Sequence, residues 1–117
     1  MENIFFQTID WTEIEKIIYN GETGFAIWQT KQFDDLRVRM VEYSAGYIAD
    51  HWCKKGHIVQ CLEGEFESQL ENGKSFIMKK GMTYIVSDDA SSHKSISKTG
   101  VKLLIIDGAF LKNENTL

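Results

Sequence analysis

The residues best able to do chemistry in this sequence are concentrated in one short stretch, ADHWCKKGHIVQCLEGE. It contains two of the three histidines, His51 and His57, and both cysteines, Cys53 and Cys61. The third histidine, His93, lies in a later polar stretch, SDDASSHKS. Imidazole nitrogens and thiolates are donors that transition metals prefer, whereas Mg²⁺ and Ca²⁺ prefer oxygen. These residue types therefore indicate a site for Zn²⁺, Fe²⁺, Ni²⁺ or copper.

The spacing of these residues predicts that strands would aim them at one point. Residues two apart on an extended strand share a face, so His51 and Cys53 would point the same way. The segment Lys54–Gly56 allows a turn, after which His57 would begin a second strand facing the first. A closed barrel would return His93 to the same place. The predicted metal ligands are therefore His51, Cys53, His57 and His93.

The elements that must position these side chains are mostly short strands. Glycines recur at short intervals and there is no proline. Asn72-Gly73, between GEFESQL and KSFIMK, is a strong signal for a β-hairpin. Strands are expected near residues 25–27, 36–41, 57–70, 82–86 and 101–106. Many short strands in about 100 residues predict an all-β sandwich or barrel.

One short helix is expected near the N-terminus. Thr12 and Glu15 can form a capping box, three isoleucines follow at helical spacing (Ile14, Ile17 and Ile18), and Asn20-Gly21 would end the helix. We expect a single domain, with an N-terminal strand or helix over 1–21, a barrel core over about 22–108 and a short tail over 109–117.

The stretch resembles the first sequence motif of the cupin superfamily, in which two histidines one residue apart precede a glutamate and a later glycine. With Gly64 as that glycine, His51 and Cys53 fall on the two histidines and His57 falls on the glutamate. GMTYIVSDDASSH resembles the second motif, with His93 near its histidine ligand. The resemblance implies a double-stranded β-helix, or jelly-roll, with these four residues inside. Cysteine replaces a histidine and histidine replaces the glutamate, so the donor set differs from the usual one.

The run RVRMVEYSAGYIADHWCKKGH is also similar to a small group of cupin-fold proteins named for a DHCW motif, for which no reaction is established. Here the four residues read Asp50, His51, Trp52 and Cys53. The resemblance therefore supports a fold and a site. Asp50 either holds a ligand histidine or forms a turn, and Trp52 should face away from the site.

Three functions stay open from the sequence. The first is a metal-dependent enzyme acting on a small molecule, in which three histidines leave positions free if Cys53 does not bind. The second is a non-catalytic barrel that binds or senses a metal or metabolite. The third is a metal-free barrel in which Cys53 is a redox-active thiol. Cys61 is expected to be a small buried apolar residue, with a Cys53–Cys61 disulfide as the alternative.

Composition and charge bear on the partners that the protein could bind and on its location. The chain has 117 residues and a net charge of −4, which does not favour nucleic acid or an anionic membrane. The start, MENIFFQTID, lacks the features of a secretory signal and no window has the length of a transmembrane helix, so a cytoplasmic location is expected. Arg37 or Arg39 could meet an anionic ligand, although a solvent-exposed strand face is the simpler interpretation. The apolar segment Ile4–Ile9 is a candidate contact in a homodimer.

Overall fold

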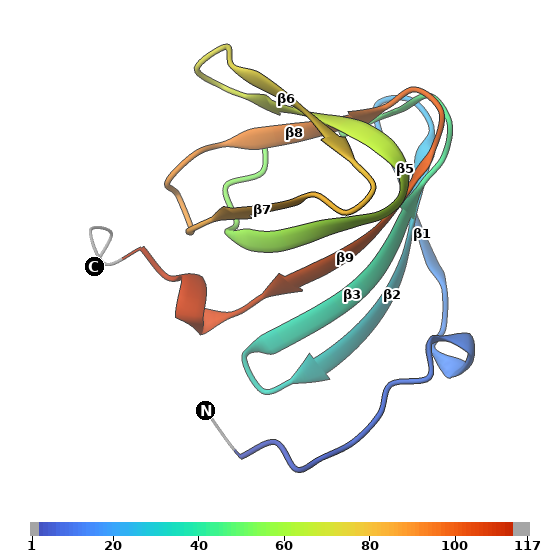
Figure 1. Cartoon of the computed structure of the whole chain (residues 1–117), viewed down its shortest axis with the longest axis vertical. Coiled ribbons are helices and arrows are strands. Elements are labelled where there is room, and N and C mark those ends of the chain that lie inside the picture. The colour runs from blue at the N-terminus through green and yellow to red at the C-terminus, as the bar shows by residue number, and fades with distance from the viewer. Residues whose placement is uncertain (1–2, 114–117) are drawn as a thin grey trace.

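The computed structural model describes residues 3–113. The strands in this range, shown in Figure 1, are β1 (Ile17–Asn20), β2 (Phe25–Phe33), β3 (Leu36–Tyr43), β4 (Tyr47–Ile48), β5 (His57–Leu70), β6 (Ser75–Lys79), β7 (Thr83–Val86), β8 (His93–Ser97) and β9 (Val101–Asp107). Two short 3₁₀ turns, η1 (Trp11–Glu13) and η2 (Ala109–Leu111), flank them. The first two residues and the last four residues of the predicted tail lie outside the described range.

The strands form one antiparallel sheet that curls into a barrel (Figure 1). The strand order is β1-β2-β3-β9-β5-β8-β4, with β6 and β7 also paired to β5. β5 belongs to both halves of the curl. Its first residues pair with β9 and β7, and its last residues pair with β8 and β6. The pairing register shifts between Cys61 and Glu63, and this irregularity lies where β5 passes from one half to the other.

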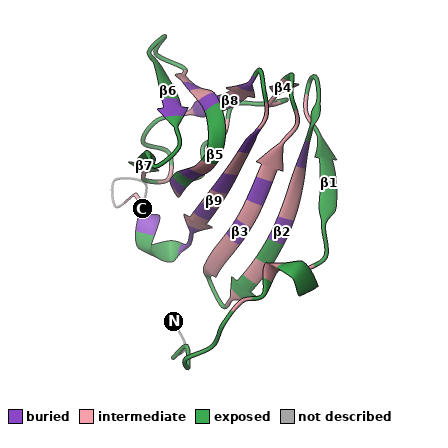
Figure 2. Ribbon diagram, turned by 45° about the vertical axis from the view of Figure 1, so that its right-hand side comes forward, coloured by how far each residue is buried: buried purple, intermediate pink, exposed green. Residues whose placement is uncertain are grey.

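Alternating burial along the strands identifies the inner face of the barrel. In β9 every second residue from Val101 to Asp107 is buried, and β5 and β8 begin with the same alternation. Figure 2 shows these buried bands on β3, β5, β8 and β9, while β1 is exposed throughout. The apolar core consists of Val41, Val59, Cys61, Phe66, Met78, Val101, Leu103 and Ile105. The predicted β-barrel, its Asn72-Gly73 hairpin and the buried position of Cys61 are thus confirmed.

The predicted N-terminal helix is wrong. Asp10, rather than Thr12, caps a single 3₁₀ turn by accepting a hydrogen bond from the Thr12 backbone. The isoleucines at 17 and 18 then lie in β1, which pairs with β2 over Phe25–Trp28. Pairing with β2 satisfies the backbone of residues whose β-branched side chains also favour strands, so tertiary context overrides a weak helical spacing.

The interpretation of the arginines as a solvent-exposed strand face is wrong for Arg39. Arg39 is only 3% exposed and points inward, on the same face as Val41. Leu36, Val38 and Met40 therefore lie on the other face of the strand. Arg39 faces the interior because a carboxylate partner lies there, as described below.

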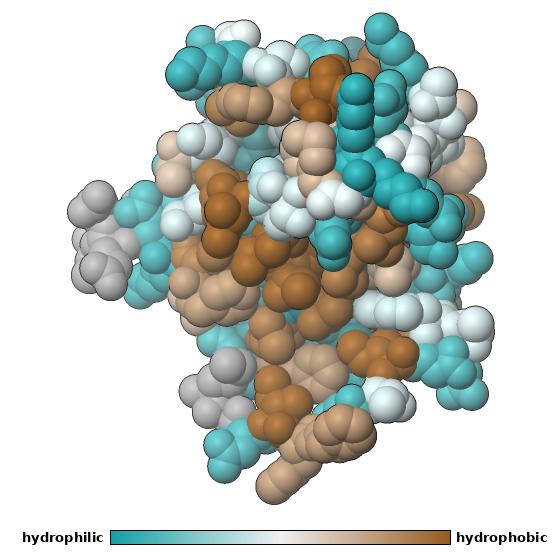
Figure 3. Space-filling model, viewed as in Figure 1, coloured by the Kyte–Doolittle hydropathy of each residue, from teal (hydrophilic) through white to brown (hydrophobic). Residues whose placement is uncertain are grey.

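Several large apolar side chains are exposed, and Figure 3 shows hydrophobic residues gathered in the middle of one face. The exposed apolar side chains include residues of the N-terminal segment, of β6 and β7, and of η2 (Ile4, Phe5, Phe6, Phe76, Ile77, Ile85 and Phe110). Contact between two copies through Ile4–Ile9 stays a prediction. Within residues 3–113, no helix has the length and apolar character needed to cross a membrane.

Candidate metal centre

Backbone pairing brings Cys53 and His93 side by side, although they are 40 residues apart. The Cys53 N–H donates to the His93 carbonyl at 2.7 Å, and the His93 N–H donates to the Cys53 carbonyl at 3.0 Å. Such a doubly bonded antiparallel pair directs both side chains to the same face of the sheet. His93 is also the first residue of β8, so its position is fixed on both sides.

His57 reaches the same place through a tight loop after Cys53. The Gly56 N–H donates to the Asp88 carboxylate at 2.7 Å, and a Cβ at Gly56 would lie 2.6 Å from the Val86 carbonyl oxygen. A larger residue would therefore push the loop away from β7. Glycine lets the chain turn here and enter β5 with His57 on the inner face.

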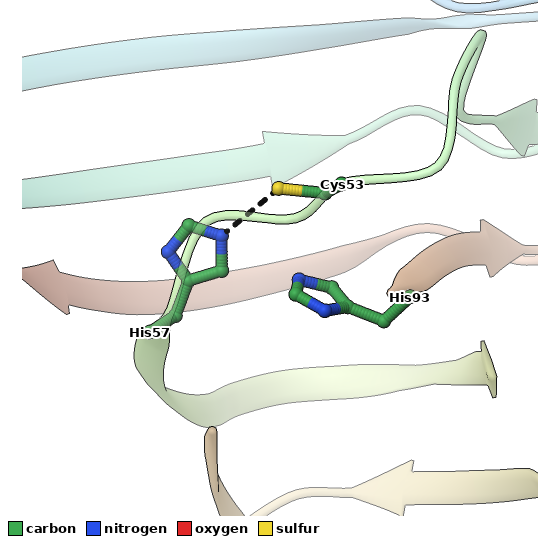
Figure 4. Close-up of side chains that lie close together, drawn as sticks. All are labelled: Cys53, His57 and His93. Atoms are coloured by element: carbon green, nitrogen blue, oxygen red, sulfur yellow. Dashed lines mark hydrogen bonds between the residues drawn. The ribbon is translucent and has the colours of Figure 1, made fainter. Parts of the chain in front are cut away.

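The side chains of Cys53, His57 and His93 converge inside the barrel (Figure 4). One ligand atom from each lies within 4.8 Å of the others. The Cys53 Sγ is 3.4 Å from the His57 Nε2. The two imidazole rings are 5.3 Å apart between centroids and nearly perpendicular, at 78°. Three of the four predicted ligands are thus brought together.

Hydrogen bonds set which nitrogen of each ring is free. The His57 Nδ1 lies 3.0 Å from an Asp107 oxygen, and the His93 Nδ1 lies 3.0 Å from the Ser91 carbonyl oxygen. Both oxygens only accept, so each Nδ1 carries a proton and Nε2 is the ring nitrogen that can offer a lone pair. The Nε2 of His93 is buried without a partner. The site therefore contains a buried nitrogen that is free to ligate a metal.

Asp107 connects His57 to the two arginines. Arg37 donates to both of its oxygens at 3.0 Å, and Arg39 donates to one at 2.9 Å. Burial alone would raise the pKa of Asp107, but the His57 hydrogen bond and the two guanidinium charges hold that pKa well below its usual range. The carboxylate is therefore ionised, and it fixes the orientation of the His57 ring.

The Cys53 thiol is activated by its surroundings. Burial acts to raise its pKa, but the hydrogen bond and charge of His57, with the charge of Arg39, bring the pKa below the ordinary value. Thiolate is the form that binds metals and reacts as a nucleophile. Both cysteines are unpaired, so the alternative Cys53–Cys61 disulfide is not formed.

The structure does not bring His51 into this cluster. Its side chain is 72% exposed, and its Nδ1 lies 2.6 Å from the adjacent Asp50 carboxylate, which is itself 60% exposed. His51 nevertheless lines the rim of the cavity above the three converging residues. Trp52 faces outward as expected, at 38% exposed. The role of His51 as a ligand stays a prediction.

A cavity of about 260 Å³ is lined by the three converging residues and by His51. Its walls include four aromatic residues, namely Trp28, Tyr43, Tyr47 and Tyr84. Tyr43 stacks on Tyr47 with ring centroids 4.2 Å apart. Burial raises the pKa of Tyr47 and of Tyr84, so both phenols are neutral.

Asp107 was not recognised from the sequence as part of the site, and the arginines were considered only as a contact for an anionic ligand, with an exposed strand face as the simpler interpretation. The strand was expected to end at Ile106, one residue before the carboxylate. A signal was present, because Asp107 continues the alternate positions of Val101, Leu103 and Ile105. An acid in phase with apolar residues on a core strand needs a buried partner. Arg37 and Arg39 are the matching cations on β3, and Arg37 pairs with Asp107 in the sheet register.

The donor set fits a transition metal. One thiol and two imidazole lone pairs match the ligands of zinc sites, and Asp107 supplies the outer carboxylate that such sites use. Tetrahedral coordination separates ligand atoms by roughly 3.3–3.8 Å. The 3.4 Å between Cys53 and His57 falls in that range. The unpartnered Nε2 of His93 would gain a partner on metal binding.

Known proteins resemble this chain in fold and not in sequence. Neither a protein-family model nor a curated protein matches the sequence. A predicted oxalate decarboxylase from Thermotoga maritima has a TM-score of 0.73 at 18% identity, covering 86% of this chain and 96% of that chain. A polyketide cyclase from Streptomyces resistomycificus has a TM-score of 0.74 at 13% identity, covering 89% and 80%.

An RmlC-like cupin from Shewanella frigidimarina covers nearly the whole chain. The match spans 98% of this chain and 97% of that protein, with a TM-score of 0.66 and 18% identity. Identities this low bear on the fold alone, and the similarity to the DHCW group stays a prediction. The antiparallel barrel and these similarities together show that the chain has the cupin fold.

Proposed function

We propose that this protein binds a divalent transition metal through Cys53, His57 and His93 and presents it to a small molecule in the cavity. The observation that carries the proposal is the convergence of three ligand atoms within 4.8 Å, one of them a buried nitrogen without a partner. A bound metal would supply Lewis-acid chemistry at this point. Asp107 would hold the His57 ring in the tautomer that leaves Nε2 free.

Three protein ligands distinguish this site from a structural one. Structural zinc sites are usually closed by four ligands, whereas three ligands leave a position for water or substrate. The cavity of about 260 Å³ is lined by all three residues, so a small molecule in the cavity could reach a metal held by them. The site therefore suits an enzyme or a ligand-binding module better than a structural zinc site. Zn²⁺, Fe²⁺, Ni²⁺ and copper all accept a donor set of one thiolate and two imidazoles.

A thiol-based function is the second candidate, because Cys53 contacts His57 and His57 in turn contacts Asp107. The Cys53–His57 contact is 3.4 Å, and His57 meets Asp107 at 3.0 Å. A nucleophile beside a base that a third group orients is the arrangement of covalent catalysis. In metal-free protein His57 would accept the thiol proton, and Cys53 would be the reactive group.

Metal content decides between the two candidates. We would purify untagged protein without chelators and measure Zn, Fe, Ni and Cu by mass spectrometry, before and after equilibration with each metal. We expect about one equivalent in the wild type and a loss in Cys53→Ala and His93→Gln. A wild type that takes up none of the four metals would contradict the metal site and leave the thiol function. Circular dichroism would verify that each variant is folded.

His51→Ala is the matched control, because it removes an imidazole from the rim of the same cavity. With three ligands, this variant keeps the metal. If it loses the metal as Cys53→Ala does, then His51 is the fourth ligand that the sequence predicts. In that case the first coordination sphere is closed.

A further inference from the structure

The two arginines of the chain, Arg37 and Arg39, both line the metal-site cavity. They face one carboxylate, Asp107, which contacts both. His57 also donates to Asp107. Asp107 carries one negative charge and faces two guanidiniums, of which Arg37 is 29% exposed and Arg39 only 4% exposed.

Arg39 is the more deeply placed of the two. Its side chain is 4% exposed, and its guanidinium lies over the Trp28 ring at 4.4 Å from the centroid. One of its nitrogens bonds Asp107, while its buried Nε has no partner. Burial and the neighbouring Arg37 charge lower the pKa of Arg39, with Asp107 opposing them, yet a guanidinium stays protonated in proteins. The molecule therefore holds an under-compensated cation at the cavity wall.

The other cations that line the cavity are two lysines. Lys55 and Lys94 are each paired with an acid that does not line the cavity, with Lys55 3.6 Å from Asp88 and Lys94 3.7 Å from Glu22. No aspartate or glutamate lines this cavity in the described part of the chain. The whole protein carries a net charge of −4, so the charged residues that line this cavity are opposite in sign to the net charge of the protein. Such a cavity concentrates small anions.

We propose that the cavity binds a small organic acid, with its carboxylate drawn to the Arg39 guanidinium and its carbon body among the aromatic side chains. A carboxylate supplies the missing counter-charge, and the planar guanidinium matches it in geometry. This inference deepens the proposed function by naming the ligand class, and it rests on that function for the role of a metal. A divalent metal with a Cys53 thiolate adds one further positive charge, which strengthens the demand for an anion.

The size of the cavity limits the acid. Sites for drug-sized ligands usually measure about 300–1,000 Å³. At about 260 Å³, this cavity is smaller than those sites. Tyr43, Tyr47 and Tyr84 offer apolar ring faces that free inorganic phosphate would not use. These features favour a compact carboxylic acid over a nucleotide or free phosphate.

Calorimetric titration tests the inference with probes of known charge. We would titrate metal-free and Zn²⁺-equilibrated protein, at constant ionic strength, with acetate, malonate and benzoate. The neutral amides acetamide, malonamide and benzamide are matched controls for shape. We expect at least one carboxylate to bind saturably, at least about tenfold tighter than its amide. Arg39→Gln should weaken that binding about tenfold or more, whereas Lys102→Gln removes a charge outside the cavity and should leave it unchanged.

The outcomes separate this inference from the metal site. Carboxylate binding in protein that takes up no metal, lost in Arg39→Gln, would keep the inference and reject the metal function. Metal uptake with carboxylate binding that is insensitive to Arg39→Gln would reject the inference and keep the metal function. If Arg39→Gln does not fold, Arg37→Gln and the comparison of acids with amides on wild type decide. No preference for any acid over its amide would overturn the inference.

Discussion

The two ends of the barrel interior are built by the same strands and differ in chemistry. At one end, β3, β5 and β9 contribute Val41, Cys61 and Val101, which are 0%, 1% and 6% exposed. At the other end the same strands contribute Arg39, His57 and Asp107, which are also buried. Register pairs Val41 with Leu103 near one end and Arg37 with Asp107 at the other. The change from core to site thus occurs along the strands themselves, and in β3 and β9 it lies within one continuous register.

This difference teaches how a small barrel can carry a site without losing its core. The apolar end excludes water and supplies most of the hydrophobic stabilisation. The polar end contributes less, because buried charges lose hydration and recover it only through their partners. Its arginines and carboxylate position the metal ligands and set the sign of the cavity. Substitutions at the two ends should therefore separate stability from metal binding.

The largest effect is expected from Asp107→Asn, which should damage both properties. The substitution keeps the shape but leaves two guanidiniums at a buried site without a counter-charge. Breaking a buried ion pair in this way costs roughly 3–5 kcal/mol, so the free energy of unfolding in urea should fall by about that amount. The His57 ring also loses its orienting carboxylate, and metal affinity should fall about 10- to 100-fold.

Acid titration and an exposed control sharpen the prediction for Asp107. The pKa of Asp107 is lowered in the folded state, so its stabilisation is complete above its unfolded pKa of about 3.9 and is lost as the pH falls. In metal-free protein the stability gap between wild type and Asp107→Asn should therefore shrink below about pH 4. Glu63→Gln, at an exposed position, should change stability by less than about 0.5 kcal/mol. A gap that does not depend on pH would show that the carboxylate charge is not the cause.

Val41→Ala should affect stability alone. Val41 is 0% exposed, belongs to the apolar core and does not line the metal-site cavity, so truncation leaves a void and should lower the free energy of unfolding by roughly 2 kcal/mol. Metal stoichiometry and affinity should stay at the wild-type values under conditions where the variant is folded. Metal affinity that falls more than about tenfold would mean that the two ends are coupled and would break the comparison.

The same contrast explains what the sequence could predict. Strands, turns and the hairpin follow local rules of alternation and glycine placement, so most elements were predicted correctly. The grouping of Cys53, His57 and His93 followed from strand parity together with the cupin resemblance. The helix failed because the spacing of Ile14, Ile17 and Ile18 is too short a signal to outweigh pairing of β1 with β2.

The polar end was harder to predict because its charges are long-range partners. Arg37 and Asp107 are 70 residues apart, and each alone resembles an exposed surface charge. A buried charge needs a partner of opposite charge, and only the pairing of β3 with β9 brings these two residues together. The sequence does not predict the outward position of His51 either, since the side chain of a residue beside a turn can face either way. Partners of this kind require the register of the sheet.

The two cysteines give the smallest of these contrasts, one at each end. Cys53 lines the cavity and its pKa is lowered, whereas burial raises the pKa of Cys61, which is 1% exposed. In metal-free protein near pH 7.5, iodoacetamide should therefore alkylate Cys53 at least about tenfold faster than Cys61, a difference of about 1.4 kcal/mol. Peptide mass spectrometry over time measures both rates in one sample. Adding Zn²⁺ should suppress the reaction at Cys53, because a coordinated thiolate is a weaker nucleophile, and should leave Cys61 unchanged. Equal rates at the two thiols would show that both ends of the barrel open together, and the distinction between core and site would then fail in solution.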